Sequence, residues 1–156
     1  LPKTARPAPA EGQLGTPLDT PGTSFTTTTM QEHYNADLTP NPTVIEAAGT
    51  KPKIIREFIG RVNSNNSDLS IAHMNSPKGW EEPGQRPEFD EYTLVINGQF
   101  QVESEGGSIT LVGKGNAITV HKDEWVRYST PHEGGAEYFA VCLPAFAPDT
   151  VHRDND

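Results

Sequence analysis

The side chains that could do chemistry are histidines, carboxylates and one thiol. The histidines are His33, His73, His121, His132 and His152. No two of them stand at the i, i+2 spacing that would put both imidazoles on one face of a strand. Divalent transition metals prefer sites with imidazole nitrogen, so the spacing shows no pattern typical of a metal centre.

Five of the 21 Asp and Glu residues gather in one acidic stretch. Its members are Glu81, Glu82, Glu88, Asp90 and Glu91. Paired carboxylates can divide acid and base work when their surroundings separate their pKa values. A solvated run of charge is the alternative interpretation of the same residues.

The single cysteine, Cys142, lies in the apolar run 139–143 (FAVCL). A nucleophilic thiol needs a nearby base and an electropositive setting, and the adjacent sequence supplies neither. We therefore expect Cys142 to be a small buried hydrophobe.

Length and charge narrow the class of protein. The 156 residues suit one domain, and the formal net charge is −9. This negative charge argues against a nucleic-acid-binding protein, which needs Lys and Arg to displace counterions from phosphates. It also argues against adhesion to an anionic membrane surface. The sequence also holds no apolar run of the roughly 20 residues that a spanning helix requires, and no charged and apolar leader after Leu1. We expect a soluble protein of the cytoplasm or an organelle rather than a secreted one.

The first forty residues differ from the rest. They are rich in proline, carry a threonine run at 26–29 and show almost no aliphatic periodicity. Such a stretch cannot bury enough apolar surface to offset its ordering entropy. Residues 1–40 are predicted to form a disordered or extended arm that could lie along a partner subunit.

Residues 41–52 are predicted to form one short helix and a linker. Asn41 can cap the free amides, Pro42 suits the first helical position and Gly49 suits the stop. A start at Thr43, with capping-box spacing, is also possible. Either helix is too short to be stable without packing on something.

From residue 53 the pattern turns to short strands rich in β-branched and aromatic residues. The predicted strands are 53–63, 69–75, 91–96, 99–103, 108–112, 117–120, 124–129 and 137–143. Asn97-Gly98 between two of them predicts a hairpin, since both central positions of a type I′ turn need positive φ. Eight short strands with regular turns imply an all-β sandwich or closed barrel. Residues 149–156 are polar and acidic and are predicted to be a solvated tail.

The run from Glu91 to Gly98, preceded by 77–79 (PKG), resembles the first sequence motif of the cupin family, and 113–130 resembles the second. In that family a His-x-His pair precedes a Glu, and six residues separate the Glu from a Gly. Glu91 and Gly98 stand at that spacing. The resemblance implies a cupin-type double-stranded β-helix, a small jelly-roll barrel, over residues 53–148.

The departures from the family pattern concern its metal ligands. Counting back from Glu91, the two histidine positions hold Gln85 and Pro87, and the third histidine position falls on Val126. Only Glu91 remains of four usual ligands, and one carboxylate with one amide is a weak site for a transition metal. We expect no ordinary cupin metal centre and no cofactor.

The family pattern implies that Glu91 points inward with Gln85 beside it, while the rest of the acidic stretch is solvated. If Val126 faces inward, strand alternation puts Tyr128 on the same face and turns Arg127 outward, where Asp90 or Glu88 could pair with it. His73 could approach Glu91 if it points into the barrel; a partly exposed imidazole is the alternative. The candidate ligand pocket is Gln85, Glu91, Tyr128, His73, Thr93 and Val126. With no Lys or Arg expected to face it, Glu91 should be neutral or hydrogen-bonded within this pocket.

Two functions from different classes follow. The first is a metal-free cupin domain that binds a small ligand or acts as an assembly subunit; the second is a divergent cupin enzyme, an isomerase, lyase or dioxygenase, with a site around Glu91. As partners we expect a second copy of the chain, or a larger complex joined through the arm. The apolar edge at 54–62 should either pair in a dimer or be covered by residues 1–40.

Overall fold

The computed structural model describes residues 36–155, and its regular elements in that range are all strands. The strands are β1 (Thr43–Ile45), β2 (Ile54–Ile59), β3 (Ser70–Ser76), β4 (Trp80–Glu81), β5 (Asp90–Ser104), β6 (Ile109–Gly113), β7 (Ala117–Val120), β8 (Val126–Thr130) and β9 (Ala136–Leu143). In this part of the chain no helix is long and apolar enough to cross a membrane.

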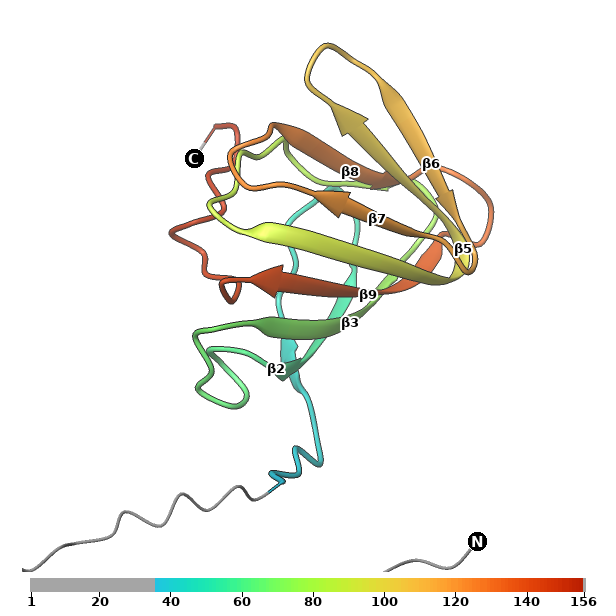
Figure 1. Ribbon diagram of the computed structural model, residues 1–156. Helices are drawn as coiled ribbons and strands as arrows, with labels where there is room; N and C mark the ends of the chain where they lie inside the picture. Colours follow the sequence, from blue (N-terminus) through green and yellow to red (C-terminus); the bar gives the residue numbers. More distant parts are fainter. Residues whose placement is uncertain (1–35, 156) are drawn as a thin grey trace, which may run out of the picture. The chain divides into compact units, whose positions relative to one another are not determined.

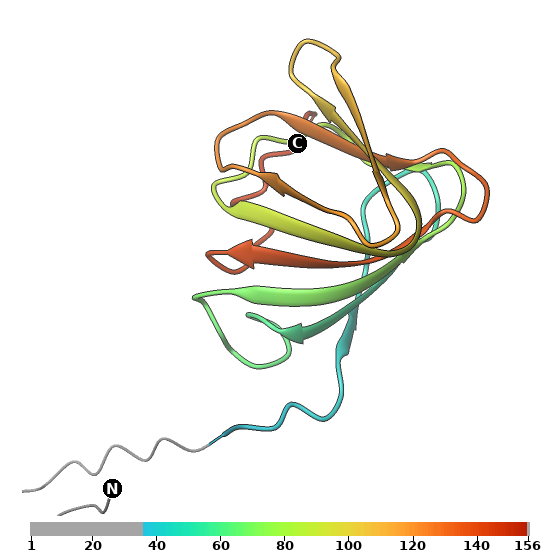
Figure 2. The ribbon, with the colours of Figure 1, turned by 45° about the vertical axis from the view of Figure 1, so that its right-hand side comes forward.

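Every strand pairing is antiparallel, in the order β1-β2-β3-β9-β5-β8-β4, with β6 and β7 also paired to β5. The long strand β5 makes this possible because its first half pairs with β7 and β9 and its second half with β6 and β8. The sheet therefore curls around an interior, as Figures 1 and 2 show from two sides. This is the jelly-roll arrangement that the motif resemblance implies.

The interior is filled by side chains that alternate along the strands. On β9, Ala136, Tyr138, Ala140 and Cys142 are all buried, with less buried residues between them. Ala136 and Tyr138 pack with inward residues of β5 and β8 such as Phe100, and Cys142 packs with Phe89 and Val151. The prediction that Cys142 is a buried packing residue is confirmed.

The hairpin predicted at Asn97-Gly98 is wrong, because both residues lie inside the continuous strand β5. A type I′ turn needs positive φ at both positions, and here only Gly98 has it, at 76°. The register with β9 shifts between Val95 and Asn97, so the pair forms a bulge rather than a turn. A Cβ on Gly98 would lie 2.0 Å from the carbonyl oxygen of Gly135, which explains why glycine stands there.

The short helix predicted within 41–52 is also wrong. Residues 43–45 form β1, in which Val44 pairs with Arg56 of β2. The run Thr43-Val44-Ile45 is β-branched throughout, which favours a strand, and the open edge of β2 satisfies its backbone groups. Residues 43–45 thus cover part of that edge, at 55–57. The prediction that residues 1–40 cover it falls mostly on residues 1–35, which lie outside the described range.

The prediction of a solvated tail at 149–156 is wrong for residues 150–154, which are packed against the barrel. Val151 is buried, and the amides of Arg86 and Glu88 donate to the carbonyls of His152 and Thr150 at 3.1 and 2.9 Å. The extended segment 82–89 needs backbone partners on its free side, and the tail supplies them.

Candidate functional site

The barrel interior holds a cavity of about 290 Å³. Its walls come from the last residue of β1, from β2, β3, β5, β8 and β9, and from the segments 46–53, 82–85 and 146–153. Much of the wall is apolar, contributed by Ile45, Ile55, Met74, Phe100, Ala140 and Phe146. The cavity reaches solvent beside Glu46, which lines it and is exposed.

Three of the six residues expected in a ligand pocket, Gln85, Glu91 and Tyr128, line this cavity. Thr93 and Val126 are buried at 2% and 1% exposure, but they lie in the packed interior and not on the cavity wall.

His73 points away from the cavity. Its Nε2 lies 2.9 Å from Glu137 Oε1 on the outer face of the sheet. Its neighbours Ala72 and Met74 line the cavity, and strand alternation sends the residue between them to the other side. An inward His73 is therefore ruled out by the register of β3.

Five charged residues that line the cavity lie outside the expected ligand pocket: Glu46, Lys53, Glu57, Glu82 and Arg153. The sequence predicts Glu82 in a solvated charge run and Arg153 in a solvated tail. The expectation that no Lys or Arg faces Glu91 is thus wrong. Strand alternation could have predicted this place for Glu82. If Trp80 is taken as buried, the residue two positions later faces the same side, and the structure shows Trp80 and Glu82 buried with Glu81 exposed between them.

Burial shifts the pKa of two of the carboxyls that line the cavity, Glu82 and Glu91. Burial and then the charge of Glu82 raise the pKa of Glu91, Lys53 and Arg153 lower it, and the result is a pKa of about 7. Burial likewise raises the pKa of Glu82, while Lys53 and Arg153 oppose it. At neutral pH Glu91 is therefore close to equally protonated and ionised.

Lys53 is held by aromatic rings as well as by charge. Its Nζ lies 4.0 Å from the centroid of a Trp80 ring and 5.4 Å from that of Tyr138. Burial lowers the pKa of Lys53, but the nearby Tyr138 and Glu82 outweigh it and leave the pKa raised. Trp80 is itself fixed, fully buried with its Nε1 donating to the Ala48 carbonyl at 3.1 Å.

Three buried side-chain polar atoms within residues 36–155 find no hydrogen-bond partner in the protein: Gln85 Oε1, Tyr128 OH and Arg153 Nε. All three residues line the same cavity. Leaving a buried donor or acceptor unpaired costs about 1–3 kcal/mol, so such groups are rare unless they face something. Glu57 gives the contrast, because its Oε1 accepts from the amides of Val62 and Asn63, each at 2.9 Å.

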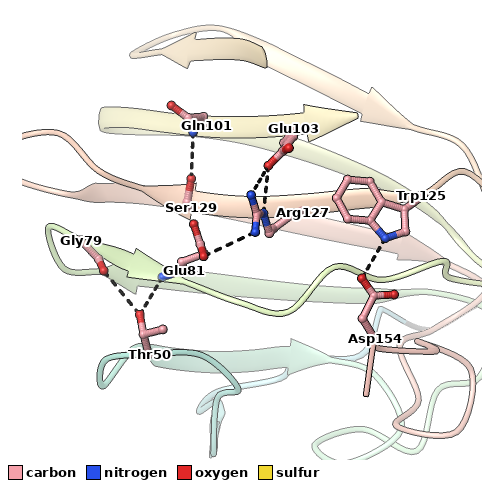
Figure 3. A network of polar contacts seen from close by, with 9 residues as sticks. All are labelled: Thr50, Gly79, Glu81, Gln101, Glu103, Trp125, Arg127, Ser129 and Asp154. Carbon is pink, nitrogen blue, oxygen red and sulfur yellow. Dashed lines mark hydrogen bonds and ion pairs between the residues drawn. The ribbon is translucent and has the colours of Figure 1, made fainter. Parts of the chain in front are cut away.

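The outer side of β8 carries a separate polar network (Figure 3). Arg127 points outward, as strand alternation predicts, and its Nε donates to Glu103 at 2.9 Å. A second guanidinium nitrogen lies 3.7 Å from Glu81. The expected partners Asp90 and Glu88 are engaged elsewhere, with the amide of Lys122 and with His152. Arg127, Glu103 and Glu81 do not line the cavity, so this network lies on the side of β8 that faces away from it.

The residues present do not fit the metal centre of ordinary cupins. In the described part of the chain, no group of three or more His, Cys, Asp or Glu side chains is placed to hold a metal ion. Beside Glu91 the motif positions carry Gln85, Pro87 and Val126, and two of these have no donor atom for a metal.

No family model matches the sequence. The endoribonuclease YbeY of Myxococcus xanthus (strain DK1622) is 36% identical over 102 residues, which are 65% of this chain and 34% of that protein. The chain thus spans about a third of the length of the curated relative it matches. That relative's activity belongs to a protein of which most lies outside the match.

Solved structures share the fold at low sequence identity. The polyketide cyclase RemF from Streptomyces resistomycificus is 17% identical with a TM-score of 0.61, covering 78% of this chain and 87% of that one. An RmlC-like cupin from Shewanella frigidimarina is 16% identical with a TM-score of 0.55, covering 69% and 87%. The chain therefore has the jelly-roll fold of cupin-type proteins.

Proposed function

We propose that the barrel cavity binds a small organic molecule, mostly apolar with one polar end. The observation that carries this proposal is the convergence of Gln85 Oε1, Tyr128 OH and Arg153 Nε, unpaired and buried, on one cavity. Tyr128 and Arg153 offer donors and Gln85 offers an acceptor. A ligand that presents a carbonyl or carboxylate oxygen beside a hydroxyl would satisfy all three.

The size and lining of the cavity limit the ligand. A volume of about 290 Å³ is the space of roughly ten waters in the liquid and lies at the small end of ligand sites. Lys53 and Arg153 offset the charges of Glu82 and Glu91. Of the two other carboxylates in the lining, Glu57 accepts hydrogen bonds from two backbone amides and Glu46 is exposed at the opening. This composition favours a molecule of small net charge, with its apolar body against Met74 and Phe100.

A second candidate is an enzyme, and one observation favours it. Glu91 combines burial with a pKa of about 7, which is typical of catalytic acids and bases. RemF, which has the same fold, is a polyketide cyclase.

The binding proposal is tested with an oxygen-bearing fragment library, by ligand-observed NMR and thermal shift on the full chain. Tyr128→Phe removes one donor of the polar end, and Tyr92→Phe is the matched control because Tyr92 is 41% exposed. We expect fragments that bind the wild type and the control alike, and that bind Tyr128→Phe about tenfold more weakly, the value of one hydrogen bond. No binding fragment, or equal binding to all three proteins, would refute the proposal.

Assembly remains a prediction of its own. Tyr92 and Leu94 on β5 and Leu143 on β9 are 41–44% exposed, so large apolar side chains face outward from neighbouring strands. We propose that a second copy of the chain pairs with this face. Sedimentation of the full chain should give a mass above the 17.0 kDa monomer, and Leu94→Asp should return it to the monomer. A monomeric wild type would refute this.

A further inference from the structure

We propose that the cavity moves a proton on its ligand: Glu91 takes a proton from a carbon beside a carbonyl group, while Tyr128 and Arg153 donate hydrogen bonds to the carbonyl oxygen. This inference rests on the proposed function, because the ligand must bind before it can react. It names the substrate class as a mostly apolar β,γ-unsaturated carbonyl compound, with an acidic C–H between the carbonyl and the carbon–carbon double bond, and the reaction class as isomerisation.

The choice of Glu91 follows from what the other cavity carboxyls do. Glu46 is exposed at the opening, and Glu57 is occupied by two backbone amides. For Glu82 the charges of Lys53 and Arg153 are the largest influences on the pKa after burial, whereas for Glu91 the repulsion by Glu82 comes before both cations. Glu91 is left as the carboxyl that can meet a ligand.

The environment of Glu91 suits a group that must both take and return a proton. Burial and the charge of Glu82 disfavour its ionised form and raise its pKa to about 7. A base of this pKa exists in both forms near neutral pH, where general acid–base catalysis is most efficient. The apolar wall strengthens the effect, because a poorly solvated carboxylate is a stronger base than a solvated one.

Two unpaired donors point to an oxygen that gains negative charge. Tyr128 OH and Arg153 Nε are buried without protein partners. Burial, followed by the charges of Glu91 and Glu82, raises the pKa of Tyr128 well above its ordinary value, so the phenol keeps its proton and donates a hydrogen bond. Donors that are already oriented in a water-poor site stabilise a developing oxyanion strongly.

The step balances without any further reactant. The Glu91 carboxylate removes the proton, the C–H electron pair becomes a carbon–carbon double bond, and the carbonyl π electrons move onto the oxygen. Tyr128 and Arg153 stabilise that enolate oxygen. The protonated Glu91 then returns the proton to another carbon of the conjugated system, the carbonyl re-forms, and the double bond has moved. Nothing is oxidised or reduced.

The test uses nitrobenzisoxazole, a small planar probe whose ring opens when a base removes its C–H proton and its N–O bond breaks, giving a coloured phenolate. We expect the full-length wild type to open it with a rate that rises with pH through an inflection near 7. Glu91→Gln should lower the rate by at least about 100-fold, and Tyr128→Phe by about 10-fold. Glu133→Gln, a surface change at a side chain 85% exposed, is the control and should leave it unchanged.

Probe binding is measured in parallel by thermal shift, and the fold of each variant by circular dichroism. Since the pH inflection is a property of the wild type, it tests Glu91 even if Glu91→Gln fails to fold. A rate without an inflection near 7, or a rate that Glu91→Gln retains, overturns the inference. If the probe binds but is not opened, the inference fails while the binding proposal stands; if it neither binds nor opens, the result counts against both.

Discussion

The backbones of Gln85, which lies outside the named strands, and Val126, the first residue of β8, exchange two hydrogen bonds of 2.9 Å each. This pair fixes the extended segment 82–85 against the start of β8. It places the Gln85 side chain on the wall to which Tyr128, two residues after Val126, also contributes. The backbone of Gln85 also forms a bridge with that of Arg153. The three residues with unpaired polar atoms, Gln85, Tyr128 and Arg153, therefore lie on neighbouring backbone segments.

Loss of the hydroxyl should change the free energy of unfolding differently at the two buried tyrosines, Tyr138 and Tyr128. Tyr138 OH is 2.9 Å from Ser76 Oγ, so Tyr138→Phe breaks a bond and leaves a buried hydroxyl unpaired, costing about 1–2 kcal/mol. Tyr128 OH has no partner in the protein, so Tyr128→Phe should leave the free energy of unfolding unchanged or raise it by up to about 1 kcal/mol. Urea unfolding measures both. Equal losses in the two variants would show that Tyr128 OH has a protein partner.

Stability should depend on pH through Glu91. Because its pKa rises from 4.5 unfolded to about 7 folded, the folded state holds this proton more tightly. The associated stability is complete below pH 4.5 and is lost as pH rises through 7. Glu91→Gln cannot ionise. Its free energy of unfolding, compared with that of the wild type, should therefore increase between pH 4.5 and pH 7, by up to about 3 kcal/mol.

Glu137→Gln is the control with the opposite sign. Hydrogen bonds from Asn97 and then His73 lower the pKa of Glu137, so its ionised form supports the fold above its ordinary pKa. This variant should match the wild type at low pH and fall below it at neutral pH. Urea titrations at pH 5 and pH 8 follow the Glu91→Gln difference. Titrations at pH 3 and pH 5 follow the Glu137→Gln difference, because a carboxyl with a lowered pKa is already ionised at pH 5. A Glu91→Gln difference that stays constant with pH would contradict the assignment.

Gly49 should be intolerant of a side chain. Its φ is +121°, and a Cβ there would lie 2.3 Å from Trp80 Nε1. Gly49→Ala should therefore cost about 2 kcal/mol or more, through backbone strain and displacement of Trp80. Gly106→Ala is the matched control, because Gly106 also has positive φ but has no atom within 4 Å of the added Cβ, and it should cost roughly 1 kcal/mol. Equal costs would mean that Trp80 does not pack against this segment.

The sequence was sufficient for the barrel because its strands carry the information locally. The β-branched runs of β2, β3 and β9 predict strands wherever they lie, and alternation along β8 predicts that Tyr128 and Arg127 face opposite sides. The same rule would have placed His73 outside once Ala72 and Met74 were taken as inward.

The rest of the cavity depends on contacts between distant segments. Arg153 lines the wall only because residues 150–154 pair with the backbone of 84–88, and a polar, acidic tail shows no sign of such pairing in its own composition. Lys53 is held inside by the rings of Trp80 and Tyr138, which lie far along the chain. The course of β5 at Gly98 also depends on distant contacts. An Asn-Gly pair favours a hairpin by itself, but here pairing with β9 produces a bulge, and the strand continues to pair with β6 and β8.

The central claim is that the polar end of the cavity receives an organic group and not a metal. The most direct measurement is a crystal structure of the full chain soaked with the strongest fragment from the binding screen. We predict an organic molecule in the cavity, with an oxygen within hydrogen-bond distance of Tyr128 OH and Arg153 Nε. An atom roughly 2.0–2.2 Å from the Glu91 carboxylate, the range of carboxylate–metal bonds, would contradict the account.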